Sequence, residues 1–566
     1  MGLISCYEVI NGHKIPGASF VQRGTYGQGL IYIMNAPSDD VVAATSSSDE
    51  GLEMEWGNYI ESTRCVRDFW KTFFVGINRC NTVLAFMNQA GLSGETKLQY
   101  EAEARFMRAF FYYHLAWNFG GVPIVTSYTS GGQEPRSSLQ EVYDFILEDL
   151  RFAYQNLNTI GILQTSSANK YTAAAYIGRV CNYLAACKRN NVGADLVAKQ
   201  PLNDFSWVDA DAMTKEALEA LAFVVNNSPY VLIDDYKNLF RETTKAEQYK
   251  ECLFLAEQPL SGAEGYWPLA FYLPSPVSNG SKTPSVYGGR HVPTPRAFYM
   301  YHPQDIRRDH NFTGRLSDGS IEEKVGEYTY YIPNPSKTRV NVTHLMVDDD
   351  GNPVYDPETG EQKTYTVEED HPLYDNPETQ TYLPTSGLQA CPGKVRLTEF
   401  SQLQHTYQQH AFSYPLMRYA DVLLMYAEAL YFSGNESEAR TQMDKVLKRA
   451  STSEENFQTL KKYYHRSDFL DELLESRERE LIFEFSRKWD LIRFNKIDEA
   501  IASLNTEKVV EMEGKVEDKY LTLSVGGALQ LGLRSLTQNW QHHKIWLPIS
   551  EEQMGVNHNL TQNAGW

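Results

Sequence analysis

The apolar residues of this chain recur with a helical period over most of its length. The period is clearest in Tyr100–Val125, where apolar side chains repeat at three- and four-residue steps in two adjacent rows. A helix that is apolar over most of its girth is expected to lie buried in a domain. We expect it to end at Gly120 and Gly121, just before Pro123, which cannot continue a helix. Its N-terminal half carries charges that would then need buried partners: Glu101, Glu103, Arg105 and Arg108.

Similar amphipathic patterns predict further helices on both sides of this one. They cover Arg64–Asn88, Ser137–Leu157, Tyr171–Lys188, Ala212–Asn226 and Asp468–Asn495, the last with Ser467 as its N-cap. In Tyr414–Ala450, two helices flank a Gly-Asn turn and carry small residues at their crossing, which resembles a tetratricopeptide unit. Such pairs stack into a concave superhelix that usually serves as a docking surface. The pattern therefore predicts a mainly α fold.

Helical periodicity disappears between residues 252 and 412. Pro, Gly, Tyr, Asn and Asp become more frequent there, and DDDGN (348–352) and DPETGE (356–361) are typical of hairpin turns. Loops held by a rigid scaffold often carry binding groups. We therefore expect three parts packed as one unit: a helical part with tetratricopeptide-like pairs (1–251), a loop-rich insertion with short strands that forms the ligand face (252–412), and a helical part with a closing tail (413–566).

Composition narrows the classes of partner. The net charge of −20 argues against nucleic acid and against an anionic membrane surface, because both attract basic patches. No apolar run is long enough to span a membrane. The seven cysteines show no metal-binding spacing, which predicts free and mostly buried thiols. Leu3–Cys6 resembles the end of a bacterial lipobox, but no basic segment precedes it, and a first helix over GLISCYEVI is the favoured interpretation.

Four segments, taken in order along the chain, share the features of one family. They are EARFMRAFFYYHLAWNFGGVPIV (103–125), YPLMRYADVLLMYAEAL (414–430), ESRERELIFEFSRKWDLIRFNK (475–496) and LPISEEQMGVNHNLTQNAGW (547–566). Together they resemble the SusD/RagB family, the surface glycan-binding lipoproteins of Bacteroidetes. Three positions depart from the family pattern: Phe485 stands where glycine is usual, and Ser550 and Ala564 replace prolines. These departures concern packing and turns rather than binding.

The resemblance implies a SusD-like fold, in which tetratricopeptide-type helix pairs form a scaffold for a loop-rich ligand face. It also implies cell-surface binding of an oligosaccharide or polysaccharide and its delivery to a SusC-like TonB-dependent outer-membrane transporter, without catalysis. The family's lipid-anchored N-terminal cysteine, its only membrane attachment, is expected to lie outside this chain. Two alternatives stay open: a peptide-binding member of the same family, and a helical-repeat scaffold that docks only protein.

Candidate ligand residues follow from the chemistry of sugars. A sugar ring needs flat aromatic side chains for its C–H face, and amide, arginine or carboxylate groups for its rim of hydroxyls. Two loop regions offer this mixture, one around the Asp39–Tyr59 segment and one in the insertion. The predicted ligand residues are Asp40, Trp56 and Asn58 in the first region, and Tyr266, Trp267, Tyr287 and Arg290 in the second.

Residues that suggest catalysis or metal binding have simpler interpretations. Glu475, Glu478, Glu480 and Glu484 are interleaved with arginines on a predicted helix, which favours ion pairs over acid–base chemistry. His542-His543 lacks a third ligand at a metal-binding spacing. Asp348–Asp350 could hold a calcium ion, but the sequence lacks the ligand at the twelfth position that an EF-hand loop needs. A plain hairpin turn is therefore favoured. We therefore expect no cofactor and no enzymatic activity, with a glycoside hydrolase as a distant alternative.

Overall fold

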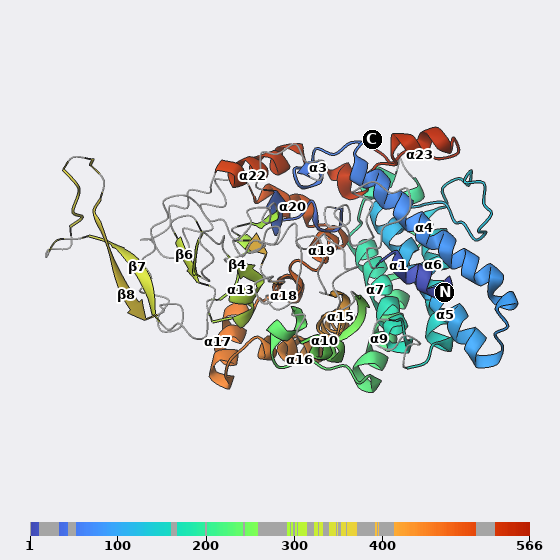
Figure 1. Cartoon of the computed structure of the whole chain (residues 1–566), viewed down its shortest axis with the longest axis horizontal. Coiled ribbons are helices and arrows are strands. Elements are labelled where there is room, and N and C mark those ends of the chain that lie inside the picture. Colours follow the sequence, from blue (N-terminus) through green and yellow to red (C-terminus); the bar gives the residue numbers. More distant parts are fainter. Residues whose placement is uncertain are drawn as a thin grey trace, which may run out of the picture.

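The predicted helices pack side by side in a continuous row (Figure 1). In the computed structural model of the chain, each helix of the row contacts the next in the order α4 (Arg64–Phe86), α5 (Gly94–Phe119), α6 (Leu139–Asn156), α7 (Lys170–Arg189), α9 (Ala210–Asn227), α15 (Tyr419–Phe432) and α16 (Glu436–Arg449). One apolar core contains residues from both helical parts of the chain. The prediction of a mainly α fold is confirmed.

The structure describes most of the helical parts and a smaller share of the insertion. The described residues are 2–10, 33–43, 52–159, 167–197, 201–240, 244–257, 291–294, 296–297, 300–302, 304–313, 322–325, 328–331, 339–346, 348, 352–357, 359–360, 362–370, 391–392, 394, 413–504 and 527–566. Cys6 is buried within α1 (Gly2–Glu8), which confirms the first-helix interpretation. The cysteines described with their side chains are buried free thiols. Among the described helices, none is long and apolar enough to cross a bilayer.

Helix α5 is the buried helix that the sequence predicts. Every residue from 106 to 119 is buried. The charges of its N-terminal half have the partners that burial requires: Arg108 donates to both carboxylate oxygens of Asp149 on α6, at 2.7 and 2.9 Å, and the Tyr7 hydroxyl donates to Glu103 at 3.1 Å. The helix ends at Gly120, whose φ of +73° is open to glycine and costly for other residues.

The exit of α5 is closed by the last residues of the chain. Arg136 donates to the carbonyl oxygens of Phe119 at 2.8 Å and Gly121 at 2.6 Å. The same guanidinium donates to the Thr561 carbonyl oxygen at 2.9 Å and to the Asn563 side chain at 2.8 Å. These acceptors are uncharged, and burial lowers the pKa of Arg136 to about 10. The closing tail is therefore part of the scaffold.

The helix pair α15–α16 begins later than the sequence pattern predicts. Residues Tyr414–Arg418 form strand β10, which pairs antiparallel with β2 (Cys252–Ala256), so the helix starts only at Tyr419. Both strands are almost entirely buried, and the apolar pattern of a short buried strand is hard to distinguish from that of a helix. The predicted turn is confirmed, with a φ of +84° at Gly434. The tetratricopeptide character of the pair stays a prediction.

The long helix predicted near the end of the chain is interrupted. Asp468, not Ser467, caps α18 (Phe469–Leu481), because its carboxylate accepts the backbone N–H of Asp471, the third residue of the helix. A short break separates this helix from α19 (Arg487–Arg493), and Phe485 in the break has a φ of +63°. Glycine is the usual residue for such a backbone. The departure from the family pattern at Phe485 is therefore one of backbone strain.

The described part of the insertion consists of short strands paired two by two. The pairs are β3 (His291–Pro293) with β1 (Val41–Ala43), β4 (Phe312–Thr313) with β9 (Cys391–Pro392), β5 (Glu322–Val325) with β6 (Tyr328–Tyr331), and β7 (Arg339–Leu345) with β8 (Thr364–Asp370). The β7–β8 hairpin projects away from the helices (Figure 1). It contains both predicted turns: Asp348 N–H donates to the Asn352 carbonyl oxygen and Gly360 N–H to that of Asp356, each at 2.9 Å.

Candidate functional site

The predicted residues Trp56 and Asn58 lie beside a helix from the other end of the chain. This helix, α22 (Gly527–Asn539), packs against β1. The Trp56 indole N–H donates to the carbonyl oxygen of Ala43 in β1 at 3.2 Å, and Asn539 of α22 donates to the Trp56 carbonyl oxygen at 3.1 Å. The N-terminal loop is therefore held in place by the C-terminal part of the chain.

Asn58 lines an open groove with a volume of about 430 Å³. Three chain segments line it, with the residues Asn58, Tyr59, Ile60, Glu61, Gln538, Asn539, Gln541, His543, Lys544, Gly565 and Trp566. The side chains of Asn58, Gln538 and Gln541 are exposed to solvent. A volume of about 300–1,000 Å³ is usual for small-molecule sites. The groove is therefore large enough to hold part of an oligosaccharide.

One wall of the groove is fixed by a short 3-10 helix, η8 (His542–Ile545). The buried ammonium of Lys544 donates to the carbonyl oxygens of Gly57 at 2.5 Å and Asn539 at 2.9 Å. The Tyr59 hydroxyl donates in return to the Lys544 carbonyl oxygen at 3.0 Å. Burial lowers the pKa of Lys544. These bonds link the N-terminal loop, α22 and η8 into one preformed wall.

The Trp566 indole supplies the aromatic surface of the groove. Its ring lies 5.4 Å from the Tyr59 ring and 4.9 Å from the His543 ring, centroid to centroid. Its N–H donates to the carbonyl oxygen of Trp546 at 3.0 Å, so the ring has a fixed orientation. Gly565 has a φ of +94°, and a Cβ there would meet the His543 ring at 2.4 Å. The tail approaches η8 this closely only because that residue is glycine.

Asp40 is buried, although its predicted role as a ligand residue requires an accessible side chain. Its side chain is 3 % exposed. Its neighbour Asp39 accepts two hydrogen bonds of 2.7 Å from Arg487 and lies 3.2 Å from Arg296. Burial would raise the pKa of Asp39, but the two guanidinium groups lower it to about 2, whereas burial and the carboxylates of Glu478 and Asp39 raise that of Asp40 to about 7. The expectation of an accessible carboxylate is wrong here, because the arginines draw the turn into the core.

The predicted ligand residues of the insertion lie outside the described residues: Tyr266, Trp267, Tyr287 and Arg290. Their roles stay predictions. Of the predicted residues that the structure describes, Asn58 lines the groove and Trp56 anchors its wall through a backbone carbonyl. Asp40 lies in the core and takes no part in the groove.

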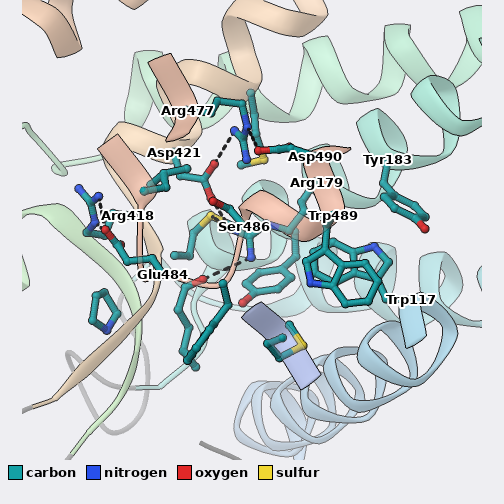
Figure 2. A pocket seen from close by; sticks show the side chains of 18 of the residues that line it. Trp117, Arg179, Tyr183, Arg418, Asp421, Arg477, Glu484, Ser486, Trp489 and Asp490 are labelled. Atoms are coloured by element: carbon teal, nitrogen blue, oxygen red, sulfur yellow. Dashed lines mark hydrogen bonds and ion pairs between the residues drawn. The ribbon is translucent and has the colours of Figure 1, made fainter. Parts of the chain in front are cut away.

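A second cavity lies inside the helical scaffold and is too small for a sugar (Figure 2). Its volume is about 60 Å³, which leaves room for a few water molecules. The rings of Trp117 and Trp489 stack beside it with centroids 4.7 Å apart. Asp421 pairs with Arg179 and accepts from Arg477 at 2.8 Å. The polar side chains of this cavity thus hold α7, α15 and α18 together.

The glutamates that suggested acid–base chemistry form ion pairs, as the interleaved arginines predict. Glu478 pairs with Arg296 and Arg487, and Glu484 pairs with Arg418. Glu480 is the most heavily paired of them and is fully buried among three arginines: Arg307, Arg418 and Arg449. Within the part of the chain that the structure describes, no cluster of three or more His, Cys, Asp and Glu side chains could hold a metal ion.

Two family models match complementary parts of the chain. One, described as the SusD family, matches residues 300–566. The other, described as "Starch-binding associating with outer membrane", matches residues 25–184. The chain belongs to the SusD family. The family models thus cover the N-terminal loop, the α22–η8 segment and the closing tail, which together line the groove.

Several SusD-type proteins match most or all of the chain. SusD-like protein P2 of Formosa agariphila is 25% identical over 478 residues, which cover 80% of this chain and 77% of that protein. The solved structure of a SusD homologue from Bacteroides thetaiotaomicron matches with a TM-score of 0.68 and 16% identity, over 100% of this chain and 96% of the other. A laminarin-binding SusD-like protein matches with a TM-score of 0.62 and 18% identity, over 100% and 98%. The SusD-like fold is confirmed.

Reasoning from the sequence missed the C-terminal half of this SusD-family groove. Gln538, Asn539 and Gln541 supply most of its amide groups, and Trp566 supplies its indole. The signal was present as an amide-rich run, QNWQHH (538–543), shortly before a terminal tryptophan. Within this run, the pattern drew attention only to His542-His543, as a possible metal pair, because nothing in it indicates a contact with residues 58–61.

Proposed function

We propose that this SusD-family protein binds an oligosaccharide or polysaccharide at the cell surface and delivers it to a SusC-like TonB-dependent outer-membrane transporter, without catalysis. The observation that carries the proposal is the groove between Asn58 and Trp566, which combines an indole face with several solvent-facing amides. Family membership supports it, since one matching model is described as starch-binding and one similar structure is of a laminarin-binding protein.

The groove suits the surface of a sugar. The Trp566 ring offers an apolar face for ring C–H groups, while Asn58, Gln538 and Gln541 can each donate and accept hydrogen bonds with neighbouring hydroxyls. The hydrogen bonds of Lys544 hold the wall in place before a ligand arrives, which lowers the entropy cost of binding. The insertion residues, Trp267 above all, would extend this surface.

The proposed location is the outer face of the outer membrane, with attachment through a lipid anchor on an N-terminal cysteine. The family description of association with the outer membrane supports the location. Cys6 is unsuited to be that anchor, because it is buried inside α1. The transporter and the anchor are therefore expected from the family alone.

We further propose that the protein is not a glycosidase. Glycoside hydrolysis generally requires two carboxyl groups that flank the scissile bond. Glu61 is the one carboxylate among the described residues that line the groove. The buried glutamates of α18 are paired with arginines and face the core. Purified protein should therefore release no reducing ends from any glycan that it binds.

Replacing Asn58 with alanine is expected to weaken glycan binding about three- to tenfold, because one amide would lose its hydrogen bonds to the sugar. Trp56→Ala and Trp267→Ala should also weaken binding, by loosening the wall and by removing a stacking surface. Affinity electrophoresis against a panel of soluble glycans would find the ligand, and titration calorimetry would then compare the variants.

Asn88→Ala is the matched control, since Asn88 is exposed and lies outside the groove. It should bind as the wild type does. Binding to peptides and to no glycan would contradict the glycan proposal in favour of a peptide-binding member of the family. Copurification with a TonB-dependent barrel but with no soluble ligand would instead favour a helical scaffold that docks only protein.

A further inference from the structure

His542, which lies between the groove residues Gln541 and His543 in the chain, bridges two carboxylates from separate segments. Its Nδ1 lies 2.6 Å from Oδ2 of Asp498 in α20 (Ile497–Ala502), and its Nε2 lies 3.2 Å from Oδ1 of Asp195 in α8 (Ala194–Val197). The other oxygen of Asp498 accepts from the Trp540 indole N–H at 2.6 Å. We call Asp195, His542 and Asp498 the histidine clamp.

The clamp requires a charged imidazole. A neutral histidine has one N–H, so it can donate to only one of two carboxylates that face its two nitrogens. The imidazolium donates to both and also attracts both negative charges. The hydrogen bond that His542 donates to Asp498 and the charges of Asp498 and Asp195 raise the pKa of His542 above its usual 6.5, against the effect of partial burial. The clamp is therefore complete in acid and loses a contact as the pH rises.

The clamp is linked to the groove through consecutive residues. Gln541 and His543, on either side of His542, both line the groove, and so does Lys544. Lys544 and Tyr59 also join this segment to the N-terminal loop. Any loosening of η8 at His542 therefore moves side chains of the groove wall.

The carboxylates that face His542 both raise its pKa. From the packed elements α8 and α20 it faces only carboxylates, those of Asp195 and Asp498. The pKa of His543, within η8 itself, is lowered by burial and by the charges of Lys544 and His542, while Glu61 opposes this shift. His543 therefore loses its charge at lower pH than His542 does, and the two titrations can be separated.

We propose that the histidine clamp makes the groove sensitive to pH, ordered when His542 is charged and loosened when His542 is neutral. The part that concerns glycan affinity rests on the proposed function. A group whose pKa is raised by folding stabilises the structure below its unfolded value, and this stabilisation is lost as the pH rises through the folded value. The groove is therefore expected to be ordered at pH values below the pKa of His542 in the folded protein, and to loosen above it.

Histidine NMR and hydrogen exchange test the clamp without any ligand. In the NMR titration, His542 should titrate above 6.5 and His543 below it. Exchange protection of residues 541–546 should fall about two- to fivefold between about pH 5.5 and about pH 8, the size expected for one partly exposed ion pair. In His542→Gln this fall should vanish, with protection near the alkaline wild-type level at both pH values.

Two further variants complete the test. Asp195→Asn should lower the pKa of His542 and move the loss of protection to lower pH. His465→Gln, which replaces an exposed histidine paired with Glu472 elsewhere, should leave the fall unchanged. A pH-dependent fall that persists in His542→Gln, or a His542 that titrates at or below 6.5, would overturn the clamp.

Glycan affinity is then measured at the same two pH values. An affinity that is higher in acid for the wild type, and equal at both values for His542→Gln, supports control of the groove by the clamp. If the NMR and exchange results hold but no glycan binds at either pH, the proposed function fails and the clamp stands. If a glycan binds equally at both values while exchange changes, the clamp does not control the groove.

Discussion

Glu480→Gln is expected to lower the free energy of unfolding by about 3–5 kcal/mol, because it removes one charge from a buried network and leaves its partners uncompensated. Glu480 lies 2.9 Å from Arg418 and 3.2 Å from Arg307, pairs with Arg449, and its side chain is 0% exposed. Arg307 lies in the insertion, in α13 (Ile306–Asn311), so the loss also removes one of the contacts between the insertion and the scaffold. Urea unfolding followed by circular dichroism would measure the change.

Glu475→Gln on the same helix is the matched control. Glu475 pairs with Arg466 near the surface, where its side chain is 28% exposed, and such pairs contribute about 0–1 kcal/mol. Equal losses for the two variants would show that the Glu480 network adds nothing beyond a surface pair.

Protonation of Glu480 in acid should weaken the same ion-pair network. Burial would raise the pKa of Glu480, but Arg449, Arg418 and Arg307 lower it from 4.5 to about 2. A carboxylate with a lowered pKa stabilises the fold above its unfolded value, and the stabilisation is lost as the pH falls toward the folded value. The wild type should therefore lose stability between about pH 4.5 and about pH 2, and Glu480→Gln should lose less over this window.

Gly121→Ala is expected to destabilise the protein by about 2–4 kcal/mol, because the new methyl group would overlap backbone atoms that cannot swing aside. A Cβ at Gly121 would lie 2.2 Å from the Ser137 carbonyl oxygen and 3.1 Å from that of Leu202. The N–H of Gly121 also donates to Asn203 at 3.0 Å, so any shift of the backbone breaks this bond. The thermal midpoint from calorimetry would report the change.

Gly131→Ala is the control for that substitution, because nothing lies within 4 Å of a Cβ at this loop position. It should leave the thermal midpoint close to that of the wild type. A Gly121→Ala protein as stable as Gly131→Ala would mean that the α5 exit can widen without cost.

Elements could be predicted from the sequence where their pattern of apolar residues reflects how they are buried. Helix α5 is mostly apolar from Phe106 to Phe119 because it is buried on all sides there, so its existence and its glycine end could be predicted. Strand β10 was mistaken for the start of a helix because its partner, β2, lies far away in the sequence. The break at Phe485 could not be predicted from periodicity, since the helical pattern continues through a backbone with positive φ.

The candidate site was predicted only where its residues are close together in the sequence. The mixture of aromatic and amide groups at Trp56 and Asn58 indicated a binding loop, and Asn58 does line the groove. Trp566 could not be connected with Asn58, because the contact joins the two ends of the chain. The burial of Asp40 could not be predicted, because a polar loop residue has the same local sequence pattern whether it is exposed or buried. Here Arg487, far away in the sequence, pairs with the neighbouring Asp39, and both aspartates are buried.

The closing of the α5 exit by the chain's own tail sets an order of assembly. Arg136 and its acceptor at Thr561 are 425 residues apart, and Asn563 and its acceptor at Phe119 are 444 residues apart. A ribosome therefore makes more than 400 further residues after α5 before the groups that complete its exit exist. During that time the exit of α5 stays open, and its contacts of high sequence separation form late in folding.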